Sequence, residues 1–196
     1  MEYLKERTFE IFRYLLPGII FQIVIFSSFI NIKNFIERIE NYKDISFIFI
    51  LIGLTASYTF GVILDEANYR FFKKVNFKKD SRDYVSKSDL TTSEKYSLLR
   101  EFSNKNYTYV EYWNALKGAC HNLGLCFITL FFISAAKLIW LRIHGDSNEE
   151  QNIWIFLLIL SFISTILMYK RGFLYDSFAD SERDSTIDIL NLNKKN

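Results

Sequence analysis

The stretch that decides the fold is Ser46–Arg70, SFIFILIGLTASYTFGVILDEANYR. The 18 residues from Phe47 to Leu64 are apolar, small or hydroxylated, and charged and amide residues follow directly from Asp65. A helix rises about 1.5 Å per residue, so 18 to 20 residues cover about 30 Å, the hydrocarbon thickness of a bilayer. The stretch therefore predicts a transmembrane helix that meets water at Asp65.

Three further apolar runs are each long enough to span a bilayer and also end at polar residues. They cover residues 15–32, 119–141 and 153–169. We therefore predict an all-α fold, an integral membrane bundle of four transmembrane helices with a helical cytoplasmic segment between the second and third spans. The chain then divides into an amphipathic leader (1–14), a first transmembrane hairpin (15–65), a basic helical segment (66–118), a second hairpin (119–170) and a polar tail (171–196).

Composition excludes several classes of protein. The 20 Phe and 12 Tyr are too many for a disordered chain, and a net charge of +2 gives no bulk attraction for nucleic acid, so we expect no direct nucleic-acid binding. Cys120 and Cys126 lie on one predicted helix at a spacing that suits neither a disulfide framework nor a metal site. We interpret both as small apolar residues.

The distribution of positive charge predicts the orientation. Residues 66–118 hold eleven of the 24 Lys and Arg. Because loops rich in Lys and Arg stay in the cytoplasm, this segment should be cytoplasmic, and four spans then place both termini there as well. We expect a multi-pass protein of the inner membrane.

The first hairpin and the basic segment carry local signals. Pro17 should lie in the first turn of its span, and Gln22 should face the bundle. Gly53, Ser57 and Gly61 recur every four residues, a small-residue stripe that lets another helix approach closely and that fits a homo-oligomer as well as packing within one chain.

In the basic segment, Thr91 with Glu94 forms a capping box that predicts a helix to about Phe102, and a second helix should cover 107–119. Near its start lie four lysines that predict either a collar for anionic lipid or a docking face for RNA or a protein. These are Lys73, Lys74, Lys78 and Lys79.

Five polar residues lie where the spans meet water, or inside them. Asp65, Glu66, His121 and Asn122 fall at the same depth in the predicted topology, and Lys137 lies near the end of the third span. One interpretation is ordinary: Asp65 sits at the interface and Lys137 extends toward water. The other is a buried polar cluster that joins the two hairpins or lines an aqueous vestibule.

No constellation for catalysis is present. The chain has no Gly-rich phosphate loop, no HExxH, no CxxC and only two His. Asp65 and Glu66 are adjacent, so they point about 100° apart on a helix and do not form a catalytic pair. We expect no enzyme, no catalytic residue, no cofactor and no metal ligand.

The chain resembles a known group of membrane proteins in several respects. It has "YLLPG" at Tyr14–Gly18, "GVILDE" at Gly61–Glu66, four predicted spans and a composition rich in Lys, Asn, Ile and Phe. This pattern resembles the small membrane accessory proteins encoded beside type VI-B CRISPR RNA-guided ribonucleases, or similar membrane proteins of bacterial defence loci. The resemblance implies a role in antiviral defence at the bacterial inner membrane, with a cytoplasmic RNA-guided nuclease or another defence protein as partner.

Two function classes follow. The first is an effector that forms homo-oligomers and perturbs the lipid bilayer or opens a pore. The alternative is a non-conducting regulatory anchor whose basic segment docks a cytoplasmic protein or ribonucleoprotein.

Overall fold

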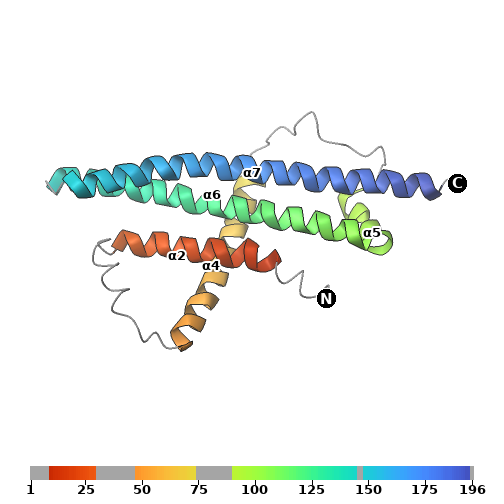
Figure 1. Cartoon of the computed structure of the whole chain (residues 1–196), viewed down its shortest axis with the longest axis horizontal. Coiled ribbons are helices and arrows are strands. Elements are labelled where there is room, and N and C mark those ends of the chain that lie inside the picture. The colour runs from red at the N-terminus through yellow and green to blue at the C-terminus, as the bar shows by residue number, and fades with distance from the viewer. Residues whose placement is uncertain (1–8, 30–46, 74–89, 145–147, 195–196) are drawn as a thin grey trace.

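The computed structural model describes residues 9–29, 47–73, 90–144 and 148–194, and every element within these ranges is a helix (Figure 1). A short π-helix, η1 (Ile11–Leu15), runs into α2 (Leu16–Phe29). The longer helices follow as α4 (Phe47–Lys73), α5 (Thr92–Phe102), α6 (Asn104–His144) and α7 (Asn148–Lys194). The all-helical prediction is confirmed for these residues.

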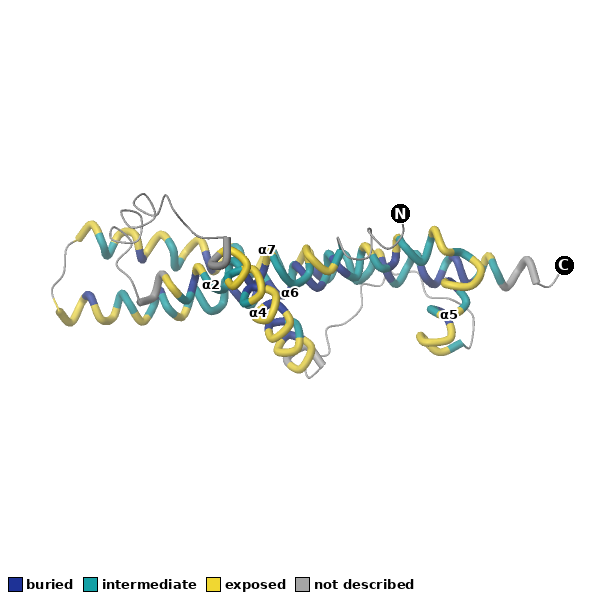
Figure 2. The backbone as a smooth tube through the Cα atoms, turned by 90° about the horizontal axis from the view of Figure 1, so that it is seen from below, coloured by how far each residue is buried: buried dark blue, intermediate teal, exposed yellow. Residues whose placement is uncertain are grey.

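Helices α6 and α7 lie side by side as a long antiparallel hairpin (Figures 1 and 2). With 41 and 47 residues, they extend about 60 Å and about 70 Å. The hydrocarbon layer of a bilayer is about 30 Å thick, so about half of the hairpin reaches beyond it. Both helices are continuous, and the predicted helix 107–119 and the third span are therefore one element.

Helix α2 lies along this hairpin, whereas α4 crosses α2 and α6 obliquely (Figure 1). The crossing depends on small residues: an added Cβ on Gly18 would overlap the Ser57 carbonyl oxygen, and one on Gly61 would overlap the Tyr14 carbonyl oxygen. The small-residue stripe is thus a packing contact at Ser57 and Gly61. An added Cβ at Gly53, in contrast, has nothing within 4 Å.

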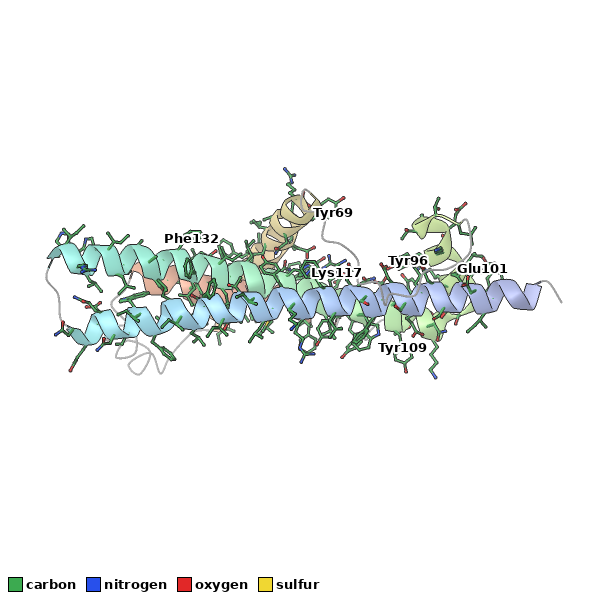
Figure 3. The ribbon with its side chains drawn as sticks, turned by 90° about the horizontal axis from the view of Figure 1, so that it is seen from above. Tyr69, Tyr96, Glu101, Tyr109, Lys117 and Phe132 are labelled. Carbon is green, nitrogen blue, oxygen red and sulfur yellow. The ribbon has the colours of Figure 1, made fainter. Side chains whose placement is uncertain are left out.

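Three helices, α4, α6 and α7, are long and apolar enough to cross a membrane. Their apolar side chains are widely exposed, as Figure 2 shows in yellow, and Phe132 on α6 is 66% exposed and projects outward (Figure 3). A water-soluble protein would not expose so much continuous apolar surface. Helix α2 has 14 residues, about 21 Å, and the end of its predicted span at Ile32 lies outside the described residues.

Helix α5 begins as predicted. The Thr91 side chain accepts a hydrogen bond from the Glu94 amide, and the Glu94 carboxylate accepts from the Thr91 amide at 2.8 Å and from its hydroxyl at 2.6 Å. These bonds stabilise the ionised carboxylate and lower the pKa of Glu94. The capping-box prediction and the helix end at Phe102 are both confirmed.

The polar ends of the hairpin and α5 form a second packing unit, which we call the α5 module: α5, residues 104–118 of α6 and residues 171–194 of α7. Its core contains Leu99, Val110, Ala179 and Ile187, all buried. Around this core, the Asn114 amide donates to the Tyr96 hydroxyl at 2.7 Å, and burial raises the pKa of Tyr96. The module therefore has an apolar core of its own, beside the apolar half of the hairpin.

A buried ion pair connects α5 to α7 within this module, and two further ion pairs within α7 adjoin it. Lys95 Nζ lies 3.3 Å from Asp184 Oδ1, and Arg183 lies 2.9 Å from the same oxygen and 2.7 Å from Asp180 Oδ1. Lys95, Arg183 and Asp184 are buried. The segment that we expected as a polar tail, 171–196, thus differs in the structure: through Lys194 it continues α7 and supplies core and ion-pair residues.

Parts of two predicted segments lie outside the described residues. The leader is described only from Phe9, and Lys74, Lys78 and Lys79 lie outside the described ranges, while Lys73 is the last residue of α4. The lipid or docking role of these four lysines stays a prediction.

Candidate functional site

An ion pair between the first two helical segments lies at the centre of the candidate site. Arg13 Nη2 is 2.7 Å from Asp65 Oδ2, and Arg13 Nε donates to Asp65 Oδ1 at 3.2 Å. Two parallel bonds of this kind fix the relative orientation of the guanidinium and carboxylate as well as their distance. The pair therefore connects η1 to the polar end of α4.

Asn122 on α6 extends this pair into a network. Its Nδ2 donates to Asp65 Oδ1 at 3.2 Å and to the Arg13 carbonyl oxygen at 3.1 Å. Its Oδ1 accepts a bond of 2.8 Å from Asn68 Nδ2, and Asn68 Oδ1 accepts one of 3.3 Å from the Tyr169 hydroxyl on α7. The side chain of Asn122 is completely buried. One chain of hydrogen bonds thus joins η1, α4, α6 and α7.

Pro17 explains why Asn122 reaches the backbone of η1. The helix begins upstream of Pro17, so the proline is interior and not in the first turn as we expected. Proline has no amide hydrogen for the carbonyl four residues earlier, which is Arg13. The chain widens into a π-turn, in which the Leu16 amide bonds to the Ile11 carbonyl, and Asn122 donates to the Arg13 carbonyl. The donor that proline removes is replaced by another helix.

The network lies at one end of the apolar bundle. Arg13 precedes the apolar part of α2, and Asp65 follows that of α4. Asn122 lies near the start of the apolar part of α6, and Tyr169 at the end of that of α7. All four helical segments thus contribute a polar group at the level where their apolar runs stop. At the edge of a membrane, an ionisable group costs much less free energy than in the hydrocarbon core.

The structure brings together only part of the predicted cluster. Asp65 and Asn122 are in direct contact. Glu66 instead lies on the exposed side of α4, where its carboxylate pairs with Arg70 at 2.7 Å. Lys137 lies 15 residues beyond Asn122 on α6, and its Nζ is 5.9 Å from the centre of the Trp140 ring. Trp140 is nearer the end of the helix, which agrees with the interpretation that Lys137 extends toward water there.

His121 directly precedes Asn122 on α6 and is buried. Its ring packs 5.7 Å from the Tyr169 ring and 5.3 Å from that of Phe173, measured between centroids. It also covers Gly172, where an added Cβ would overlap the imidazole. The His121 ring thus packs against α7 at three successive positions of its surface.

Sequence reasoning missed Arg13, Asn68 and Tyr169. Asn68 had a usable signal, because it follows Asp65 by three residues and therefore lies on the same helix face. Arg13 and Tyr169 had none, since their partners are 52 and 101 residues away.

Most of the described hydroxyl groups in the apolar part of the bundle form hydrogen bonds within it, and the buried Ser134 hydroxyl is an exception. Ser57 Oγ contacts Gln22 Oε1 at 3.2 Å, in line with the expectation that Gln22 faces the bundle. Other hydroxyls bond to carbonyls of their own helix, four residues earlier, at 2.8–3.0 Å. These are Thr55, Thr59, Thr129 and Thr165. Such bonds leave the helix backbone intact and satisfy each hydroxyl donor within its own helix.

The described residues contain no group of three or more His, Cys, Asp or Glu that could hold a metal ion. Comparisons of the chain with protein-family models, curated proteins and solved structures find no match.

Proposed function

We propose that this protein is a regulatory membrane anchor that holds a cytoplasmic protein at the bacterial inner membrane through its α5 module, as part of antiviral defence. The observation that carries the proposal is the continuity of α6 and α7 from the apolar bundle into the module. Because neither helix is interrupted at that boundary, the position of the module relative to the membrane is set by the bundle.

Contacts at two levels support a rigid connection. At the boundary, the network of Arg13, Asp65 and Asn122 fixes η1 and α4 to α6. Beyond it, Lys117 Nζ pairs with Asp176 Oδ1 at 2.6 Å, and Lys95 pairs with Asp184. A docking surface held by such contacts loses little conformational freedom when a partner binds, which favours affinity.

The orientation belongs to the proposal. The distribution of Lys and Arg favours a cytoplasmic α5 module and cytoplasmic termini, with α2, α4, α6 and α7 as the four spans. The resemblance to accessory proteins of type VI-B CRISPR loci suggests an RNA-guided nuclease, or another defence protein, as the partner.

The test measures recruitment and membrane integrity together. The proteins encoded by neighbouring genes are tagged one at a time, and their share in the membrane fraction is compared with and without this protein. Dye uptake and membrane potential are recorded in the same cells under phage challenge. The anchor predicts recruitment of one tagged protein with an intact membrane potential. Depolarisation that depends on this protein, with no recruitment, would refute it.

A second candidate is an oligomeric effector that perturbs the bilayer. The observation in its favour is the first half of α4, where Ile50, Leu51 and Ile52 are about half exposed and Gly53 has no neighbour within 4 Å of an added Cβ. Another copy could pack there as closely as Tyr14 packs on Gly61. Disulfide formation between copies carrying Gly53→Cys, together with depolarisation, would favour this candidate over the anchor.

A further inference from the structure

An exposed apolar strip on α7 ends in two positively charged residues. Ile163, Ile166 and Leu167 are 49%, 52% and 53% exposed, and their spacing places them on one face of the helix. Lys170 follows Ile166 by four residues and Leu167 by three, and Arg171 follows Leu167 by four, so both continue this face. Both are exposed. The strip therefore leads directly to two cations.

The two cations lie at the depth of lipid headgroups. Their neighbour Tyr169 belongs to the network at the end of the apolar bundle. Lys170 and Arg171 follow Tyr169 by one and two residues, or about 1.5 Å and about 3 Å along the helix. The polar layer of a bilayer is about 5–8 Å thick on each side. A lipid beside the strip would thus place its headgroup at the cations and its acyl chains on the isoleucines and the leucine.

The charges of Lys170 and Arg171 are not balanced within the described part of the chain, where neither forms an ion pair. The residues three and four positions away on α7 include no Asp or Glu. The next acid along α7, Asp176, already pairs with Lys117 on α6, with 2.6 Å between Oδ1 and Nζ. The strip therefore ends in two net positive charges.

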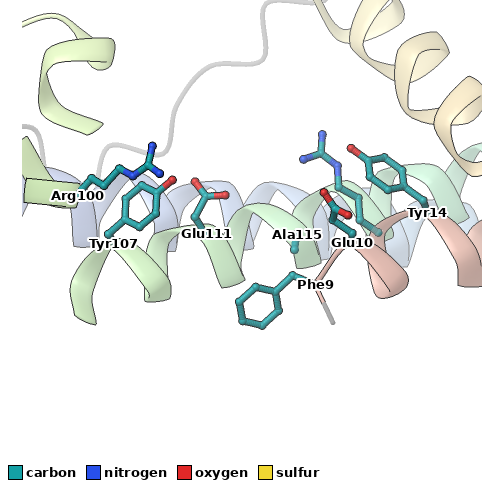
Figure 4. Close-up of a pocket in the computed structure, with 8 residues that line it drawn as sticks. Phe9, Glu10, Tyr14, Arg100, Tyr107, Glu111 and Ala115 are labelled. Atoms are coloured by element: carbon teal, nitrogen blue, oxygen red, sulfur yellow. The ribbon is translucent and has the colours of Figure 1, made fainter. Parts of the chain in front are cut away.

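The groove beside α5 differs in this respect. Its lining includes Arg13 and Arg100 together with Glu10 and Glu111, so the charges cancel (Figure 4). Arg13 is also paired with Asp65. The groove offers no net charge to a ligand, whereas the end of the α7 strip does.

We infer that this strip binds an anionic phospholipid. Its phosphate contacts Lys170 and Arg171 through charge-assisted hydrogen bonds, and the guanidinium can bond two phosphate oxygens at once. A zwitterionic lipid carries the same phosphate, but its ammonium group finds no free acid on this face of α7. The inference goes beyond the anchor function, because a lipid held here sets the depth of α7 in the bilayer whether or not a partner binds.

The test measures lipid binding to the purified full chain by native mass spectrometry from a neutral detergent. Phosphatidylglycerol is titrated in, and phosphatidylcholine with the same acyl chains is the comparison probe. Phosphatidylglycerol should bind saturably and more tightly. Each Lys or Arg near an anionic headgroup contributes a factor of about five, so Lys170→Gln should weaken this binding about fivefold and Lys170→Gln/Arg171→Gln about 25-fold. Binding of phosphatidylcholine should change much less.

Lys105→Gln is the matched control, because Lys105 is an exposed lysine on α6 that precedes Asn122 by 17 residues, about 25 Å along the helix. It should bind phosphatidylglycerol like the parent chain. The exchange Lys170→Arg/Arg171→Lys keeps both charges and should also keep the binding. An unfolding midpoint in SDS equal to that of the parent chain shows that a variant is folded.

Soluble glycerol 3-phosphate distinguishes a lipid site from a phosphate site. It lacks acyl chains, so an excess should not displace phosphatidylglycerol. Full displacement by glycerol 3-phosphate would overturn the inference of a lipid site. Undiminished binding in Lys170→Gln/Arg171→Gln, or an equal loss in Lys105→Gln and Lys170→Gln, would overturn the assignment of the two cations.

Discussion

Replacing Asn122 by Ala should destabilise the helix bundle more than any comparable exposed substitution. The side chain is completely buried and makes three hydrogen bonds, to Asp65, to the Arg13 carbonyl and from Asn68. Hydrogen bonds between helices in membrane proteins contribute on average about 0.6 kcal/mol each, and at most about 1.7. The Arg13 carbonyl also loses the donor that replaces the missing amide hydrogen of Pro17, and an unsatisfied buried carbonyl costs about 1–3 kcal/mol.

Since these two contributions overlap, we expect Asn122→Ala to lower the free energy of unfolding by about 2–4 kcal/mol. The assay is reversible unfolding of the full chain in mixed micelles of increasing SDS content, followed by tryptophan fluorescence. Asn152→Ala is the matched control, because it removes the same atoms from an exposed position on α7. A difference below about 0.5 kcal/mol between the two variants would refute the reasoning, since that is the range of ordinary surface substitutions.

A double-mutant cycle with Asn68→Ala then tests the origin of the loss. The two variants should be non-additive, because Asn68 and Asn122 share a direct bond of 2.8 Å. Strict additivity with a large single effect would show that Asn122 stabilises by packing and not through the network.

Three further outcomes are expected. Gly61→Ala should separate α4 from η1 and destabilise the bundle, because the new Cβ overlaps the Tyr14 carbonyl oxygen, which has little freedom to move. Gly53→Ala should be neutral or should stabilise the bundle by up to about 1 kcal/mol, because its new Cβ has nothing within 4 Å. The same SDS titration measures both variants. Asp184→Ala should leave two buried cations without their shared acceptor and cost about 3–5 kcal/mol, with faster amide exchange in α5 as the readout. The pKa of Glu94 is lower in the folded chain than its unfolded value of about 4.5. The ionised Glu94 carboxylate therefore stabilises α5 fully above pH 4.5, and this stabilisation is lost as the pH falls through the pKa of the folded chain. A carboxyl ¹³C titration should therefore give a Glu94 midpoint below 4.5 that rises in Thr91→Val, and an unchanged midpoint in that variant would contradict the assigned cause.

The local elements of this protein are determined by the sequence alone. The Thr91–Glu94 capping box predicts where α5 begins because its donors and acceptors are three residues apart in the chain. The apolar runs predict long membrane-type helices because the length of a run and its sharp ends are local properties. Ser57 and Gly61 also identify the close helix crossing, since only small residues permit it.

The tertiary structure alone decides which polar groups meet. From the sequence, Asp65 and Glu66 are equally good candidates for the buried polar network. The rotation of α4 against η1 directs Asp65 to Arg13 and leaves Glu66 exposed. Charge and polarity likewise suggest a tail at Arg183 and Asp184, and only the docking of α5 on the hairpin shows that both are buried there. Arg13 and Asp65 are 52 residues apart in the chain, and Lys95 and Asp184 are 89 residues apart. No local pattern specifies a contact between residues so far apart.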